Sequence, residues 1–136
     1  MTKQLNAVLV RRMQAESDLS MADFEVLVQL TDKADGRVRY ADLAGGLAWE
    51  KSRLSHHIAR MQRRGLVDRQ ICPTDGRGAF VAVTPQGRRA IERAAPRHVE
   101  TVRELVFDTL SGEQVWQLRA IADRVLAGLA DEPPAE

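Results

Sequence analysis

The spacing of apolar residues predicts that most of this chain is helical. In residues 3–17, apolar side chains recur three or four positions apart, which is the spacing of one helix face. Ser20 and Asp23 form a capping-box pattern that predicts the start of a second helix, and an Asp-Gly turn at residues 35–36 ends it. Residues 40–47 predict a short third helix, although each of its two glycines costs about 1 kcal/mol relative to alanine.

A fourth helix is predicted over residues 51–64, after a turn at Ala48-Trp49 and before a helix-ending Gly65. Its buried stripe follows helical spacing and consists of Leu54, Ile58 and Met61. At about 100° per residue, the opposite face holds hydroxyl, imidazole and guanidinium groups but no carboxylate. This face consists of Ser52, Ser55, His56, Ala59 and Arg63, and Arg53 and Arg60 flank it. A merely solvated face usually mixes both signs of charge, so we interpret this one as a contact surface for DNA.

The second half of the chain predicts a hairpin and two more helices. Residues 66–72 and 79–83 predict strands on either side of a turn-rich tip. Thr84-Pro85 predicts the start of a long helix that reaches about Thr109, and Pro96 should kink or split it.

Ser111 and Gln114 form a second capping box, which predicts a last helix. Its apolar residues step by three and four positions in a heptad seam of Val115, Leu118, Ala122, Val125 and Leu129. Such a seam usually faces another helix, so we expect it to contact a second subunit.

Positive charge is concentrated in residues 51–77. This segment holds seven of the twenty basic residues and two of the nineteen acidic ones, although the whole chain carries a formal net charge of only +1. Phosphates respond to the local field more than to the total charge. The segment therefore indicates a nucleic-acid partner.

Other classes of function lack their signals in this sequence. A hydrophobic fraction of 44% and no apolar run of about 18 residues are typical of a soluble protein, and without a signal peptide we expect it in the cytoplasm. The soft metal ligands, His56, His57, His98 and Cys72, lack zinc-like spacing. No catalytic motif occurs, so we expect no metal, no cofactor and no enzymatic activity.

Together, these elements resemble the MarR family of bacterial transcription regulators. Leu43-Ala-Gly-Gly-Leu-Ala-Trp-Glu-Lys-Ser-Arg-Leu-Ser55 resembles the family's helix-turn-helix, and Arg64-Gly-Leu-Val67 resembles the exit from its recognition helix. Asp75-Gly-Arg77, followed by Val81-Ala-Val-Thr-Pro-Gln-Gly87, is similar to the family's wing and the helix start after it. The resemblance covers nearly the whole chain.

The resemblance implies a mainly α fold with a small β-hairpin wing. We expect a single domain over residues 1–130, with a winged helix-turn-helix lobe at about 38–84 and dimerisation helices at about 3–17 and 85–130. Residues 131–136 should form a disordered tail. The first helix begins later than is usual in the family, which predicts a smaller dimer contact or a start further upstream.

The resemblance also implies a homodimeric repressor that binds double-stranded DNA at a pseudo-palindromic operator and responds to a small-molecule effector. The fourth helix would enter the major groove, and Arg77 at the wing tip would enter the minor groove. Asp75 would hold Arg77 in position through a charge-assisted bond. His57 lies nearer the buried stripe than His56, so we expect it to pack or bond within the protein.

Two alternatives remain open at this stage. A winged helix can serve as a protein-interaction module, with the basic face bound to an acidic partner. Cys72 lies near Arg69 and Arg77, so oxidation of its thiol could regulate binding, although a small strand residue is the plainer interpretation. A ligand cavity could be lined by Phe24, Trp49, Met13 and Phe107. Aromatic and methionine residues at helical spacing are more often part of the core, so we assign no ligand-binding residue.

Overall fold

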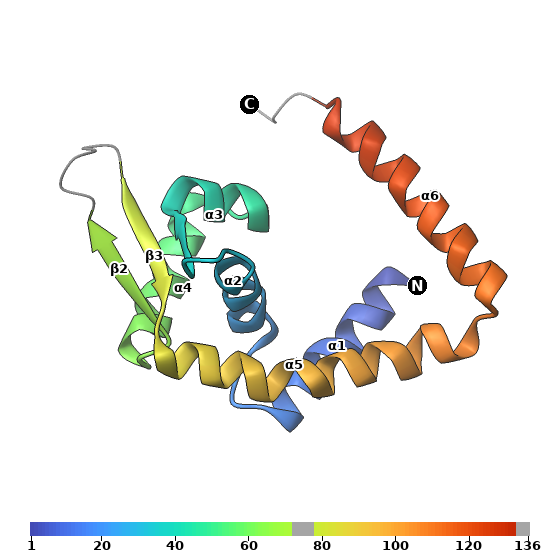
Figure 1. The fold of residues 1–136 in the computed structure, drawn as a ribbon, viewed down its shortest axis with the longest axis horizontal. Helices are drawn as coiled ribbons and strands as arrows, with labels where there is room; N and C mark the ends of the chain where they lie inside the picture. Colours follow the sequence, from blue (N-terminus) through green and yellow to red (C-terminus); the bar gives the residue numbers. More distant parts are fainter. Residues whose placement is uncertain (72–77, 133–136) are drawn as a thin grey trace. The chain divides into compact units, whose positions relative to one another are not determined.

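The computed structural model describes residues 1–71 and 78–132, in two compact units, Met1–His98 and Val99–Glu136 (Figure 1). Cys72, Asp75, Arg77 and the last four residues of the expected tail lie outside the described residues. The elements, in chain order, are α1 (Thr2–Glu16), α2 (Met21–Thr31), β1 (Arg37–Arg39), α3 (Tyr40–Leu47), α4 (Lys51–Arg63), β2 (Val67–Ile71), β3 (Ala79–Val83), α5 (Pro85–Leu105), the 3-10 helix η1 (Phe107–Thr109) and α6 (Gly112–Ala130).

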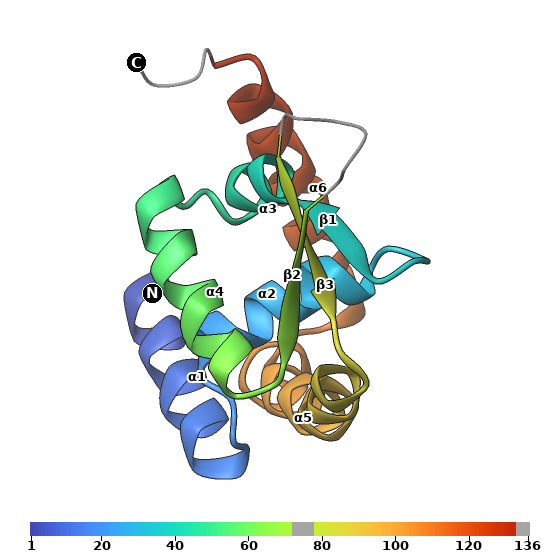
Figure 2. The ribbon, with the colours of Figure 1, turned by 90° about the vertical axis from the view of Figure 1, so that its left-hand side faces the viewer.

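The sheet has three antiparallel strands in the order β1-β3-β2 (Figure 2). The hairpin β2–β3 was predicted, and Val67 lies opposite Val83 in it. Strand β1 was not predicted. It spans only Arg37–Arg39, and although buried Val38 lies between two exposed arginines, three residues are too short an alternation to predict a strand.

The core of the first unit joins helices α2, α3 and α4 to one face of the sheet. Its large side chains with less than 2% exposure are Val26, Leu27, Leu30, Leu43, Leu54, Ile58, Met61, Val67 and Val81. All three residues of the predicted stripe on α4 are among them. The burial of this stripe turns the opposite face of α4 outward, and a mainly helical winged helix-turn-helix fold is therefore confirmed.

Both predicted capping boxes are present. The Ser20 hydroxyl accepts from the Asp23 backbone N–H, and Ser111 accepts in the same way from Gln114. Helix α4 ends at Arg63, and Gly65, two residues later, has a φ of +74° that suits glycine; the Leu66 N–H then donates to the Met61 carbonyl. These local bonds set where the helices begin and end.

Helix α5 starts at a close junction with the end of α4. The Thr84 hydroxyl donates to the Gly65 carbonyl at 2.6 Å and accepts from the Gly87 N–H at 3.0 Å. Gly87 lies so close to the Leu66 carbonyl that a Cβ would clash with it. The predicted Thr-x-x-Gly helix start thus has a steric reason.

Pro96 does not split α5, which runs without interruption from Pro85 to Leu105. Pro96 was predicted to kink or split this helix, and the split is wrong. A proline removes a single backbone hydrogen bond, and the carbonyl that loses it belongs to the exposed Glu92. Water can satisfy that carbonyl. The helix ends at Leu105, earlier than predicted, and η1 follows.

None of the residues of helix α6, Gly112–Ala130, is buried in the described part of the chain. Its large apolar side chains are exposed, including Leu118 and Val125 of the predicted seam. The exposed set on this helix is Trp116, Leu118, Ile121, Val125, Leu126 and Leu129. An apolar face of this size on one helix is unusual for a monomer.

Candidate nucleic-acid interface

A tight turn joins α3 to α4. Ala48 adopts a left-handed conformation with φ of +54°, and it is the only non-glycine residue with positive φ in the described part of the chain. The Trp49 N–H donates to the Ala44 carbonyl, which closes the C-terminal end of α3. This turn fixes the direction in which α4 leaves α3 (Figure 2).

The structure brings the predicted DNA-contact residues of α4 together on its outer face. Five of the six are exposed and Ser55 is half-buried; the exposed ones are Ser52, Arg53, His56, Arg60 and Arg63. The helix contains no acidic residue. The outer face therefore presents hydrogen-bond donors and positive charge with no carboxylate among them. Both phosphates and guanine edges can accept from such groups.

The Arg53 side chain has a defined position on this face. Its guanidinium carbon lies 4.0 Å from the centre of the Trp49 ring, at the start of α4. A cation over an aromatic face is attracted by the ring quadrupole. Trp49, which is half-buried, thus holds Arg53 at the end of the helix nearest the turn.

The sheet contributes further arginines that the sequence interpretation missed. Arg37 and Arg39 flank the Phe80 ring, at 4.6 and 5.1 Å, and Arg69 lies 4.9 Å from the Tyr40 ring. The alternation Arg-Val-Arg in residues 37–39 was the available signal, since it places both arginines on the face opposite buried Val38. The strands thus add positive charge to the wing side of the lobe.

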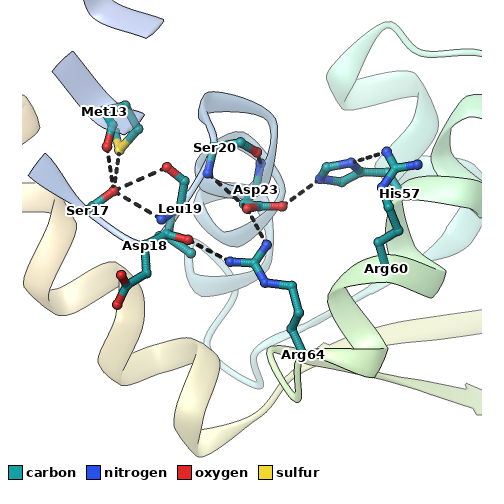
Figure 3. A network of polar contacts seen from close by, with 9 residues as sticks. All are labelled: Met13, Ser17, Asp18, Leu19, Ser20, Asp23, His57, Arg60 and Arg64. Atoms are coloured by element: carbon teal, nitrogen blue, oxygen red, sulfur yellow. Dashed lines mark hydrogen bonds and ion pairs between the residues drawn. The ribbon is translucent and has the colours of Figure 1, made fainter. Parts of the chain in front are cut away.

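A network of polar contacts surrounds the buried Asp23 side chain, between α2 and α4 (Figure 3). Oδ2 of Asp23, on α2, accepts from the Ser20 N–H at 2.9 Å and from Nη1 of Arg64 at 2.7 Å. Oδ1 lies 2.9 Å from Nε2 of His57. This last contact is short in distance, but the buried Nε2 forms no hydrogen bond of regular geometry, so we treat it as an electrostatic contact.

The Asp23 carboxylate is charged in this network. Burial by itself raises the pKa of the Asp23 carboxyl, but the contacts with His57, Arg64 and the Ser20 backbone outweigh it and hold the pKa well below its usual range. Arg64 also donates to the Asp18 carbonyl at 2.6 Å. Arg64 therefore turns toward Asp18 and Asp23 and away from the outer face of α4, although 44% of its side chain is exposed.

His57 and Arg60 join this network to the outer face. Nη2 of Arg60 lies 3.0 Å from Nδ1 of His57, whose ring stands edge-on to Trp49 with centroids 5.4 Å apart. His57 is 8% exposed. The expectation that it packs and bonds within the protein is confirmed.

A groove of about 500 Å³ lies between helices of the first unit. Phe24 lines it, and the His98 ring packs against Phe24 with centroids 4.8 Å apart. Burial lowers the pKa of His98. The groove is lined by Asn6, Leu9, Met21, Phe24, Glu25, Val28, Gln29, Gly46, Leu47 and His98. Most of the side chains that line the groove are thus apolar, and its polar side chains are those of Asn6, Glu25, Gln29 and His98.

Comparison with known proteins identifies the fold. The sequence profile of the MarR family matches residues 19–78. The transcriptional regulator HosA of Escherichia coli O111:H- is 32% identical over 97 residues, which are 71% of this chain and 70% of that protein. The chain belongs to the MarR family. It is a MarR-family transcriptional regulator, as the resemblance of its motifs predicted.

Two solved MarR-family structures match nearly the whole chain. One is Sco3205 of Streptomyces coelicolor in complex with DNA, with a TM-score of 0.88 and 36% identity over 98% of this chain and 85% of that one. The other is AbsC of the same organism, with a TM-score of 0.85 and 33% identity over 96% of this chain and 90% of that one. The likeness therefore extends beyond the winged lobe.

Within residues 1–71 and 78–132, none of the helices combines the length and the apolar character that crossing a membrane requires.

Proposed function

We propose that the protein is a homodimeric repressor that binds double-stranded DNA at a pseudo-palindromic operator. The observation that carries this proposal is the outer face of α4, which is exposed, basic and free of acidic residues beside a tightly fixed turn. In the winged helix-turn-helix mode, α4 lies in the major groove, and Ser52, Arg53, Ser55, His56, Arg60 and Arg63 contact the DNA. The DNA-bound relative Sco3205 supports this arrangement.

The wing completes the proposed contact. Arg77 would enter the minor groove, whose potential is most negative in A·T-rich tracts, and Asp75 would orient Arg77. The arginines of the sheet, Arg37, Arg39 and Arg69, would add attraction to the nearby phosphates.

Dimerisation is supported by the exposed apolar residues of α6. A second copy of the chain would cover them, and two-fold symmetry would then present two α4 helices to half-sites about one helical turn apart. The groove beside Phe24 and His98 supports a small, mainly apolar effector whose binding would release the DNA.

Binding to total genomic DNA at low and moderate salt tests the proposal directly. Because each phosphate contact releases counterions, affinity must fall as salt rises. Bound fragments are then selected and sequenced to obtain the operator. A protein-interaction module with an acidic partner would show no enrichment of any DNA sequence.

Arg63→Ala tests the role of α4 on the selected operator. If Arg63 reads a base, we expect a loss of about 1–3 kcal/mol and a relaxed preference at one position in each half-site. A uniform loss on all sequences would assign Arg63 to a phosphate instead. Arg119→Ala on α6 is the matched control, because the Arg119 side chain is 82% exposed and lies outside the lobe.

A further inference from the structure

Asp23 is a buried charge whose position is not explained by helix capping alone. As the N3 residue of a capping box it needs only the Ser20 N–H, which an exposed carboxylate could equally bind. The Asp23 side chain is instead 3% exposed, and its second oxygen faces His57 on α4. A buried carboxylate is costly unless it is paired, so these contacts define its environment.

The contacts of His57 determine which of its ring nitrogens carries the proton. A guanidinium group has only N–H donors, so the Nδ1 atom that faces Arg60 must be the acceptor. The proton of the neutral ring is then on Nε2, which lies 2.9 Å from the Asp23 carboxylate. The negative charge of Asp23 favours this tautomer, in which Nδ1 can hold the Arg60 guanidinium.

We propose that Asp23 is a positioning residue for DNA binding: through His57, it orients the Arg60 guanidinium on the outer face of α4. This inference rests on the proposed function, since it assumes that Arg60 contacts DNA. Asp23 itself lies on α2, behind α4, and does not reach the outer face (Figure 3).

Groups from three segments of the chain hold the Asp23 carboxylate and the His57 ring in place. Just before α2, the Ser20 N–H donates to Oδ2 of Asp23, and just after α4, Nη1 of Arg64 donates to the same oxygen. The Trp49 ring, in the turn before α4, stands edge-on to His57 at 87° between ring planes. With both the carboxylate and the imidazole fixed, Arg60 is oriented before DNA arrives. Preorientation removes part of the entropy cost of binding.

Asp23→Asn tests the proposal, because it keeps the shape of the side chain and removes its charge. We expect DNA binding to weaken about 2- to 10-fold, which corresponds to the cost of immobilising one long side chain. The decisive measurement is the same substitution combined with Arg60→Ala. In that background, Asp23→Asn should cost almost nothing, because no guanidinium remains to be oriented.

Arg63→Ala provides the matched background. Arg63 is exposed on the same helix and, within the part of the chain that the structure describes, forms no hydrogen bond or ion pair with His57, so Asp23→Asn should keep its full effect there. A general disturbance of α4 would weaken binding equally in all three backgrounds, and that result would overturn the proposal. An unchanged affinity of Asp23→Asn in the wild-type background would overturn it as well.

A second variant covers the case in which Asp23→Asn does not fold, as judged by circular dichroism. His57→Phe keeps an aromatic ring beside Trp49 and removes both nitrogens, and its effect should also vanish with Arg60→Ala. The failure of the proposed function can be told apart from the failure of this inference. The proposed function fails if the wild-type protein shows no salt-dependent DNA binding. Only this inference fails if the wild-type protein binds DNA and Arg60→Ala binds it with the same affinity.

Discussion

At the scale of single residues, His98 links the stability of the first unit to pH. Burial lowers the pKa of His98 from its ordinary value of 6.5. Between the folded and the unfolded pKa, the unfolded state therefore binds more protons, so stability rises with pH and falls as pH drops below about 6.5. The slope should remain below about 1.4 kcal/mol per pH unit, which is the limit for one proton.

The measurement is the free energy of unfolding from denaturant titrations at several pH values, for the wild-type protein and for His98→Phe. The phenylalanine ring keeps the contact with Phe24 but does not titrate. The free energy of unfolding of His98→Phe minus that of the wild-type protein should increase as pH falls from 7. A difference that is constant with pH would contradict the assignment to His98.

Neighbouring residues also show what the sequence could and could not predict about the site. Helical spacing predicted Arg63 on the outer face of α4 and Arg60 at its edge, and both side chains are exposed. Arg64 looks equivalent in sequence, yet it turns inward to Asp23 and Asp18. Its partners come from the segment around α2, far away along the chain. Periodicity within one element carries no information about such partners.

At the scale of elements, the sequence was informative wherever the determining contacts are local. Capping boxes and the glycine after α4 gave helix boundaries to within a residue or two. Strand β1 was missed because its pairing with β3 joins residues 37–39 to 80–82, and only three residues carry the pattern. The continuity of α5 through Pro96 likewise depends on solvent access to one carbonyl, which the sequence does not show.

The junction between the end of α4 and the start of α5 should be intolerant of a side chain. In Gly87→Ala, the added Cβ would meet the Leu66 carbonyl, and a backbone atom cannot move aside as a flexible side chain can. We expect a loss of about 1–3 kcal/mol in the free energy of unfolding.

Gly45→Ala is the control for this prediction. Gly45 lies within α3, and a Cβ there has nothing within 4 Å. Alanine should therefore stabilise the helix by up to about 1 kcal/mol. Two glycine-to-alanine changes in the first unit should thus have opposite signs in the same denaturant titration. Equal effects would show that the junction can relax.

At the scale of the whole molecule, the exposed face of α6 predicts that the chain assembles as a dimer. Leu118→Glu with Val125→Glu should give monomers that lose DNA binding, because one copy presents only one α4 to the operator. Light scattering at micromolar concentration gives the mass, and operator titration gives the affinity.

The control for dimerisation adds the same charge elsewhere on α6. Gln117→Glu with Ala127→Glu changes two exposed residues outside the heptad seam. That variant should remain dimeric and keep its affinity. A wild-type monomer at micromolar concentration would refute the dimer, and a dimeric seam variant would place the interface on another surface.

The positions of the two tryptophans give each unit its own optical signal. The chain has two tryptophans, and Trp49 lies in the first unit beside α4, while Trp116 lies on α6 with 70% of its surface exposed. Emission from Trp49 depends on the guanidinium and imidazole groups around it, and emission from Trp116 depends on whether a second copy excludes water from it. Each substitution leaves one tryptophan, so fluorescence would separate DNA binding from dimerisation. In Trp116→Phe, the remaining Trp49 emission should change when the operator is added. In Trp49→Phe, the remaining Trp116 emission should change on dilution.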